Sequence, residues 1–320
     1  MGRGKKTSLK AALSSQQTRL KKKQEALQAA QLAEQKSKKK PNQTPSSSRG
    51  KGKAISRPAT IPFSPTDKIL LVGEGNFSFT RALVDDPPAV LQYLPPGNIT
   101  ATAYDSEPDC YSKYPDAEQI VQVLREKGVE VLFKIDATKL EKCSALKGRK
   151  FDKIVWNFPH AGKGITDQDR NILSNQLLLL GFLRSAARLL ATGPIPSISG
   201  TRKKKKKDDD ESEDEGAGSA SDAEMDKAPG TTRGSVLITL RNVPPYTLWD
   251  LSKLAKNPPP PEHTNEPPNP RYIQLRSFVF DRSMWKGYEH RMTKGERAHG
   301  QGKTGQGGED RMWQFCLRDD

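Results

Sequence analysis

The feature that most constrains the fold is a series of short, largely apolar runs spaced along residues 68–156. They are Ile69–Val72, Ile99–Tyr104, Glu130–Ile135 and Lys153–Trp156. Runs of this length are typical of strands that are buried on both faces of a parallel sheet. Between the second and third runs, apolar residues recur at helical spacing, and Gly128 follows them as a cap. The alternation predicts an α/β fold: a mostly parallel sheet with helices on both faces.

The same pattern continues after the fourth run. Residues 167–190 are typical of a long helix that begins with acidic residues, where the helix dipole favours negative charge. Val236–Leu240 predicts a fifth strand, and residues 246–255 predict a short helix. The apolar stretches 272–280 and 312–317 could close the sheet as a final antiparallel pair.

Two segments have compositions that do not favour a packed core. Residues 1–66 are polar and Lys-rich, and the first 60 carry 16 Lys or Arg against two Glu, nearly all of the net charge of +15. They predict a disordered basic tail. Residues 197–234 join blocks of like charge to Ser, Gly and acidic residues, which predicts a disordered charged insertion. We therefore expect one folded domain, built from residues 67–196 and 235–320.

The charge and cysteine patterns bear on partners and compartment. Lysine clusters at 21–23 and 38–40 suit the nuclear import machinery and attraction to nucleic-acid phosphates, the alternative being a tail that only aids solubility. The three cysteines are far apart, so we expect neither disulfides nor a metal site, and a reduced compartment. No apolar run approaches the length of a membrane span, so we expect no membrane partner. We also expect a monomer.

The turn after the first strand is the strongest chemical signal. Gly73-Glu74-Gly75-Asn76-Phe77-Ser78 ends a strand and opens a helix at about Ser78. Glycines there let the backbone approach a ligand, and the free N–H groups of the helix start face a polar or negative group. The pattern lacks the third glycine of the dinucleotide fingerprint. It predicts a nucleotide-like cofactor, the alternative being a tight turn alone.

Polar residues end the next three strands. Asp105 follows the second strand, where such folds hold ribose hydroxyls, and Asp136 follows the third, where it could accept a hydrogen bond from an adenine amino group. The fourth ends in Asn157-Phe158-Pro159-His160, the predicted catalytic group. This turn resembles the Asn-Pro-Pro-aromatic turn of amino-group methyltransferases, although the order of residues departs from it. In that turn the Asn holds the target nitrogen and the aromatic stacks on the base, a role for Phe158 or His160.

These segments together resemble a known family. The run Ile69–Phe79, with Ala103–Ser106 and Phe151–Gly164, resembles the fungal and plant large-subunit rRNA uridine-N(3) methyltransferases. That domain also occurs in proteins with a ferredoxin-fold anticodon-binding domain. The resemblance implies a Rossmann-like class I methyltransferase fold and S-adenosylmethionine as cofactor. It also implies a nucleolar enzyme of ribosome biogenesis that acts on a uridine of the pre-ribosomal large subunit. Leu71 stands where many methyltransferases carry an acid, so cofactor contacts there must differ.

The chemistry implied is a direct displacement that depends mainly on positioning. The proton on uridine N(3) must be removed, and Asp136, His160 and His290 are the candidate acceptors. Two other functions stay open at this point. One is a dinucleotide-dependent oxidoreductase, and the other is a non-catalytic RNA-binding assembly factor that keeps a degenerate fold.

Overall fold

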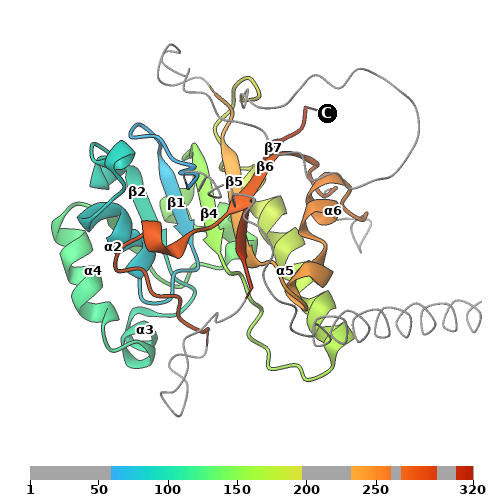
Figure 1. Cartoon of the computed structure of the whole chain (residues 1–320), viewed down its shortest axis with the longest axis horizontal. Helices are drawn as coiled ribbons and strands as arrows, with labels where there is room; N and C mark the ends of the chain where they lie inside the picture. The colour runs from blue at the N-terminus through green and yellow to red at the C-terminus, as the bar shows by residue number, and fades with distance from the viewer. Residues whose placement is uncertain (1–58, 197–231, 261–267, 294–307, 320) are drawn as a thin grey trace, which may run out of the picture. The chain divides into compact units, whose positions relative to one another are not determined.

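A seven-stranded mixed sheet is the centre of the computed structural model, which describes residues 59–196, 232–260, 268–293 and 308–319 (Figure 1). The strand order is β3-β2-β1-β4-β5-β7-β6. The first five strands pair in parallel, β7 is antiparallel to β5, and β6 is antiparallel to β7. This confirms the predicted α/β fold and its final antiparallel pair. The strands are β1 Ile69–Val72, β2 Ile99–Thr102, β3 Glu130–Leu132, β4 Lys153–Asn157, β5 Ser235–Arg241, β6 Tyr272–Val279 and β7 Asp310–Leu317.

The order of the strands reverses at β1. From β1 the chain first builds outward through β2 and β3, then returns to place β4 and β5 on the other side. A reversal of this kind leaves a crevice beyond the carboxyl ends of the two central strands, where doubly wound folds bind ligands. The loops that follow β1 and β4 therefore face the same crevice.

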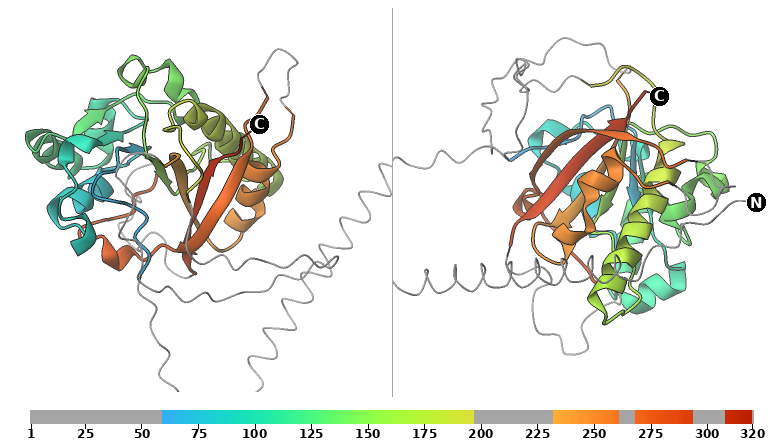
Figure 2. Two further views of the ribbon diagram at one scale, coloured as in Figure 1. Left: turned by 90° about the horizontal axis from the view of Figure 1, so that it is seen from above. Right: turned by 90° about the vertical axis from the view of Figure 1, so that its right-hand side faces the viewer.

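The helices cover both faces of the sheet, as the sequence predicts. Because side chains alternate along a strand, Ile69 and Leu71 of β1 pack on one face with α2 and α4. Leu70 and Val72 pack on the other face with α5 and α6, which lie side by side (Figures 1 and 2). The α-helices are α2 Ser78–Asp85, α3 Glu107–Lys113, α4 Ala117–Glu126, α5 Gln168–Ala187 and α6 Leu251–Lys256. Short 3-10 helices are η1 Ala89–Leu91, η2 Pro96–Asn98, η3 Ala137–Lys142, η4 Ser144–Leu146, η5 Tyr246–Trp249 and η6 Arg282–Met284.

Local sequence explains where the long helices begin and end. Asp167 caps α5 by accepting a hydrogen bond from the Arg170 backbone N–H at 2.8 Å. Gly128, two residues after α4, adopts φ +91°, a conformation that favours glycine. The third strand is shorter than predicted, because Lys134 turns into the left-handed region at φ +60°. Beyond that turn the chain still donates hydrogen bonds to the segment that follows β2.

The folded part begins before the predicted boundary at residue 67. Phe63 is 7% exposed, and its ring lies edge-on to Trp285 with the centroids 5.8 Å apart. The Asp67 carboxylate accepts a hydrogen bond from the Ser64 backbone N–H at 2.8 Å. The rest of the predicted tail, residues 1–58, and most of the predicted insertion, residues 197–231, lie outside the described residues. Among the helices described, none is both long and apolar enough to cross a membrane.

Candidate active site

The loop between β1 and α2 has a backbone that few residues other than glycine could follow. Gly73 adopts φ +67°, and a Cβ at this position would lie 2.6 Å from Nε1 of Trp156. Phe77 is also left-handed, at φ 61°, and is held there by complete burial against Phe133. A non-glycine residue in this region costs about 1–3 kcal/mol and persists where the surroundings enforce it, often at ligand sites. The strain therefore lies in the predicted cofactor loop.

Side chains of this loop cap the start of α2. Asn76 Oδ1 accepts from the Ser78 backbone N–H at 3.2 Å. One oxygen of Glu74 accepts from Thr80, from the backbone N–H at 3.2 Å and from the hydroxyl at 3.1 Å. Burial raises the pKa of Glu74 to about 7, and the hydrogen bonds from Thr80 lower it by less. An enclosed carboxylate whose contacts are neutral donors is suited to a positively charged ligand.

The loop opens into a cavity of about 100 Å³ at the carboxyl edge of the sheet. The ends of three parallel strands meet around it, as the sequence predicts. The Asp105 carboxylate, at the end of β2, also pairs with the ammonium of Lys113 at 2.6 Å. The predicted site residues that line this cavity are Gly73, Glu74, Gly75, Asn76, Ser78, Asp105, Asn157 and Phe158.

Asn157 presents an unused hydrogen-bond donor in this cavity. Its Oδ1 accepts from the Thr239 hydroxyl at 2.7 Å. Its Nδ2 is buried and has no hydrogen-bond partner within the described part of the chain. Buried donors are nearly always paired, so an unpaired one at a candidate site suits an acceptor on a ligand.

Phe158 directly follows Asn157 and is also in a left-handed conformation, at φ 52°. The guanidinium of Arg282 lies 4.9 Å from the centre of its ring. The ring of His290 lies 4.4 Å away, centroid to centroid, tilted by 45°. These two groups therefore occupy part of the ring surface on which a base would stack.

The other predicted site residues do not line the cavity. Phe77 packs in the core, and Pro159 is buried. Nδ1 of His160 accepts from the Gly162 backbone N–H at 2.9 Å, and its ring lies 6.1 Å from Trp249, on the α6 side. His160 is therefore directed away from the cofactor loop.

Asp136 caps η3 instead of facing the cavity. Its Oδ1 accepts from the Thr138 backbone N–H at 2.9 Å and hydroxyl at 2.6 Å, and Oδ2 lies 3.3 Å from the Lys139 ammonium. Burial alone would raise the pKa of Asp136, but these contacts outweigh it and hold the pKa below its usual value. The carboxylate is thus satisfied by its own turn, and this geometry does not support the predicted adenine contact.

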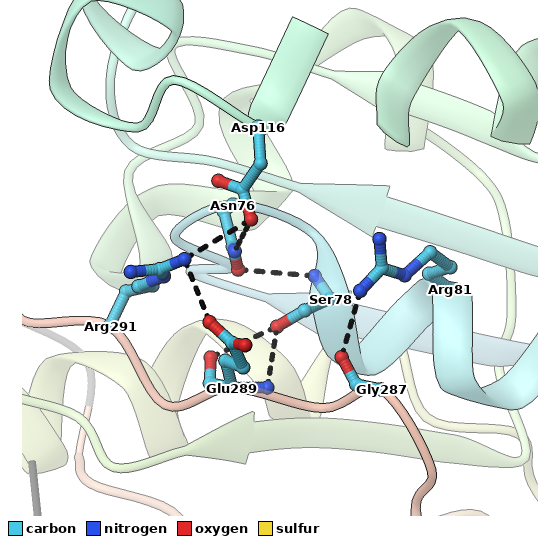
Figure 3. Close-up of polar contacts among 7 residues, drawn as sticks. All are labelled: Asn76, Ser78, Arg81, Asp116, Gly287, Glu289 and Arg291. Atoms are coloured by element: carbon cyan, nitrogen blue, oxygen red, sulfur yellow. Dashed lines mark hydrogen bonds and ion pairs between the residues drawn. The ribbon is translucent and has the colours of Figure 1, made fainter. Parts of the chain in front are cut away.

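A segment far along the chain lies across the cofactor loop (Figure 3). We call residues 287–293 the strap. The Ser78 hydroxyl donates to the Glu289 carbonyl at 2.9 Å and accepts from the Glu289 N–H at 3.1 Å. Arg81 donates to the Gly287 carbonyl at 3.0 Å. The start of α2 is thereby tied to the strap at two points.

The rest of the strap closes the cavity from the same side. The Arg291 guanidinium lies 3.2 Å from the Asp116 carboxylate, and the Tyr114 hydroxyl donates to the Met292 carbonyl at 2.8 Å. Burial, reinforced by two nearby arginines, lowers the pKa of His290 to about 4, so its imidazole is neutral at pH 7. Of these residues, the sequence identified His290 alone as a site candidate, because 211 positions separate Ser78 from Glu289 and no local pattern joins them.

The cavity combines a glycine loop, an acceptor at the end of β2 and an enclosed carboxylate. These groups fit a nucleoside ligand that carries a positive charge. Pockets for ligands of that size commonly enclose about 300–1,000 Å³. The cavity has about 100 Å³, so in this conformation it is smaller than the whole of such a ligand.

Comparison with known proteins finds one matching family model and several similar relatives. The sequence model of the BMT5-like family, described as rRNA (uridine-N3-)-methyltransferase BTM5-like, matches residues 70–292. The chain is 28% identical over 257 residues to the 25S rRNA (uridine(2634)-N(3))-methyltransferase of Saccharomyces cerevisiae, covering 74% of this chain and 69% of that protein. It is 38% identical over 125 residues to the mouse ferredoxin-fold anticodon-binding domain-containing protein 1 homolog, covering 39% of this chain and 18% of that protein.

A solved structure of an S-adenosylmethionine-dependent methyltransferase from Clostridium acetobutylicum is also similar. It shares 14% identity, with 78% of this chain and 83% of that chain covered, at a TM-score of 0.28. At that TM-score the similarity carries no argument about the site.

Proposed function

Because the chain belongs to the BMT5-like family of rRNA (uridine-N3-)-methyltransferases, we propose that it methylates N3 of a uridine in large-subunit ribosomal RNA. S-adenosylmethionine is its methyl donor. The observation that carries the proposal is the meeting of the glycine loop, Asp105 and Asn157 around one cavity. A dinucleotide-dependent oxidoreductase is set aside on the family match, which covers the loop and residues 287–292 of the strap.

The cofactor would be held by the ends of β1 and β2. The loop 73–78 and Asp105 line the cavity, so the backbone of the loop would lie against the ligand and Asp105 would accept from ribose hydroxyls. Leu71 carries no charge at the position where many methyltransferases have an acid. Glu74, three residues later, offers an enclosed carboxylate for a positive group of the cofactor. When bound, S-adenosylmethionine would supply a methyl group whose carbon a nucleophile attacks as the carbon–sulfur bond breaks and S-adenosylhomocysteine leaves.

The target base would be held by the end of β4. The unpaired Nδ2 of Asn157 can donate to a carbonyl oxygen of the uracil ring. Loss of the N3 proton leaves negative charge spread over the neighbouring carbonyls. A donor fixed in place by Thr239 stabilises that charge, and removal of one such donor commonly lowers kcat about 100- to 1,000-fold.

His290 is the proposed proton acceptor. Of the three candidates read from the sequence, Asp136, His160 and His290, it is the one that lines the cavity. Its lowered pKa of about 4 keeps the imidazole in the neutral form that can accept a proton. The same low pKa makes it a weak base, so we propose that stabilisation of the uracil anion by Asn157 contributes the larger share.

The test is to measure 3-methyluridine in large-subunit rRNA from cells that lack the protein. We expect the modified nucleoside to be lost at one position and restored by the wild-type chain. Asn157→Asp is the matched variant, because it keeps an acceptor for Thr239 and removes the donor. It should bind S-adenosylmethionine as wild type does and restore little methylation. Unchanged 3-methyluridine in cells without the protein would refute the proposal, and full restoration by the variant would refute the role of Asn157.

The place of action is proposed from the charge of the tail. Residues 1–60 hold 16 basic residues, which suit both nuclear import and phosphate attraction. We propose a nucleolar enzyme that acts on the pre-ribosomal large subunit during ribosome biogenesis. The charged insertion predicted at residues 197–234 stays a prediction for residues 197–231, which lie outside the described residues, whereas Arg233 and Gly234 donate backbone hydrogen bonds to Pro194 and Ala191.

A further inference from the structure

A second cavity lies beyond the carboxyl end of β5. It encloses about 460 Å³ between the segment after β5, helix α6 and Trp313 of β7. That volume lies within the range of about 300–1,000 Å³ that is usual for small-ligand pockets. None of its lining residues lines the cofactor cavity. The proposed chemistry therefore leaves this space, which we call the β5 cavity, without a role.

The β5 cavity opens at the same edge of the sheet as the proposed target site. Asn157 is in register with Thr239 of β5, and the Phe158 N–H donates to the Thr239 carbonyl at 2.9 Å. Beyond this point the two chains separate. β4 turns into the cofactor cavity, while β5 continues to Leu240 and Asn242 in the β5 cavity. Adjacent strands lie about 4.8 Å apart, so the segments that lead into the two cavities leave the sheet from neighbouring points on that edge.

Aromatic side chains connect the two regions. The ring of His160, in the turn after β4, lies 6.1 Å from the ring of Trp249. Trp249 in turn lies 5.0 Å from Tyr246, which lines the β5 cavity. The turn predicted to be catalytic thus packs through Trp249 against the wall of this cavity, which explains why His160 is directed away from the cofactor loop.

The walls of the β5 cavity combine aromatic rings with positive charge. Tyr246 and Trp313 are half-buried, and Lys253 and Lys256 are exposed in the last turn of α6, three residues apart on one side of the helix. Within the described residues neither lysine forms a salt bridge, and Asp250 is the one carboxylate among the lining side chains. Aromatic rings stack on nucleic-acid bases, and lysines attract phosphates.

We propose that the β5 cavity is a subsite for one nucleotide of the substrate RNA, adjacent to the uridine that is methylated. Its base stacks on Tyr246, and its phosphate lies between Lys253 and Lys256. This inference rests on the proposed function, because it places the RNA strand along the edge that carries Asn157. The subsite would position the strand and so decide which neighbour of the target uridine is accepted.

The test uses the full chain and a labelled oligouridine of about 12 nucleotides, with affinity read from fluorescence anisotropy. Tyr246→Ala should weaken binding about 5- to 150-fold, and Tyr246→Phe, which keeps the ring, should bind as wild type does. Changing both Lys253 and Lys256 to Ala should make the negative slope of log affinity against log salt shallower by about 1.4.

The control changes Lys127, which pairs with Asp85 at 2.7 Å, and Lys147 to Ala. These lysines lie on the segments that lead into β3 and β4, at the opposite edge of the sheet. Replacing them removes the same charge as replacing Lys253 and Lys256. We expect the control to leave the slope near the wild-type value. Equal affinities for Tyr246→Ala and Tyr246→Phe, or equal slopes for the two lysine pairs, would overturn the subsite.

S-adenosylmethionine binding, measured by calorimetry on the same variants, separates this inference from the proposed function. Every variant should bind the cofactor as the wild type does, and this also shows that the variants are folded. A wild-type chain that binds no S-adenosylmethionine would refute the proposed function. Normal cofactor binding with RNA affinity unaffected by the β5 cavity would refute the subsite alone.

Discussion

Replacing Glu74 by glutamine should stabilise the ligand-free protein and weaken its affinity for S-adenosylmethionine. Burial raises the pKa of Glu74 from 4.5 to about 7, against the opposing hydrogen bonds from Thr80. A shift of this size corresponds to about 3 kcal/mol. The ionised carboxylate is therefore a cost that the folded protein bears at neutral and higher pH.

The sign of the pH dependence follows from the raised pKa. Between pH 4.5 and about 7 Glu74 is mostly protonated in the folded chain and mostly ionised in the unfolded chain. The contribution of this group to the free energy of unfolding is complete below pH 4.5 and is lost as the pH rises to about 7. Glutamine has no charge to lose, so Glu74→Gln should be more stable than wild type at about pH 8, by up to about 3 kcal/mol, and similar at low pH.

The effect on the cofactor runs in the opposite direction. The ionised carboxylate would pair with a positive group of S-adenosylmethionine, a charged hydrogen bond worth about 1.5–3 kcal/mol. At about pH 8 the variant should therefore bind about 10- to 150-fold more weakly. Wild-type affinity should fall about tenfold per unit as the pH drops below 7, and that of the variant should not.

The assays are urea unfolding and calorimetric titration of S-adenosylmethionine, each at about pH 5.5 and about pH 8. Glu118→Gln, at an exposed glutamate of α4, is the control for loss of a negative charge. S-adenosylhomocysteine, which lacks the sulfonium charge and keeps the ammonium, shows which positive group is recognised. If Glu74→Gln bound S-adenosylmethionine as tightly as wild type at the higher pH, Glu74 would only cap α2, and the reasoning would be refuted.

Three further changes test the loop, the strap and the tail. Gly75→Arg should abolish cofactor binding and leave RNA affinity near wild type, because even a Cβ there would lie 3.2 Å from Cβ of Arg291; wild-type methylation by this variant would exclude the loop as the cofactor site. Ser78→Ala removes both hydrogen bonds to the Glu289 backbone and should speed amide hydrogen exchange at Glu289 about 5- to 150-fold, whereas an unchanged rate would mean that other contacts hold the strap. Deleting residues 1–60 should reduce nuclear accumulation and RNA affinity at low salt, and a chain unaffected in both would contradict the role of the tail.

Much of the sheet could be predicted from the sequence, because burial imposes a local pattern. A strand buried on both faces is a short apolar run wherever it lies, and Ile69–Val72 is a strand with the predicted limits. The turn after it predicts a helix that opens at about Ser78, which is where α2 begins. The meeting of the loop, Asp105 and Asn157 at one edge follows from parallel strands, whose carboxyl ends share an edge.

The direction of individual side chains at that edge could not be predicted. Asp136 follows a strand as Asp105 does, but its carboxylate accepts hydrogen bonds from the neighbouring Thr138 and does not line the cavity. His160 follows Phe158 by two residues and packs instead toward Trp249. Each outcome depends on a competition between nearby partners, which residue type and spacing leave open.

The amino-acid sequence by itself determined the strands, the glycine loop and the family, because each is written in contiguous residues. The tertiary structure decided what covers the loop. The strap reaches Ser78 from 211 positions away, and it adds His290, Glu289 and Arg291 to the lining of the cavity. The tertiary structure also shows that the β5 cavity and the cofactor cavity are separate. Contacts between distant segments depend on how the whole sheet and its helices pack, so no local sequence pattern predicts them.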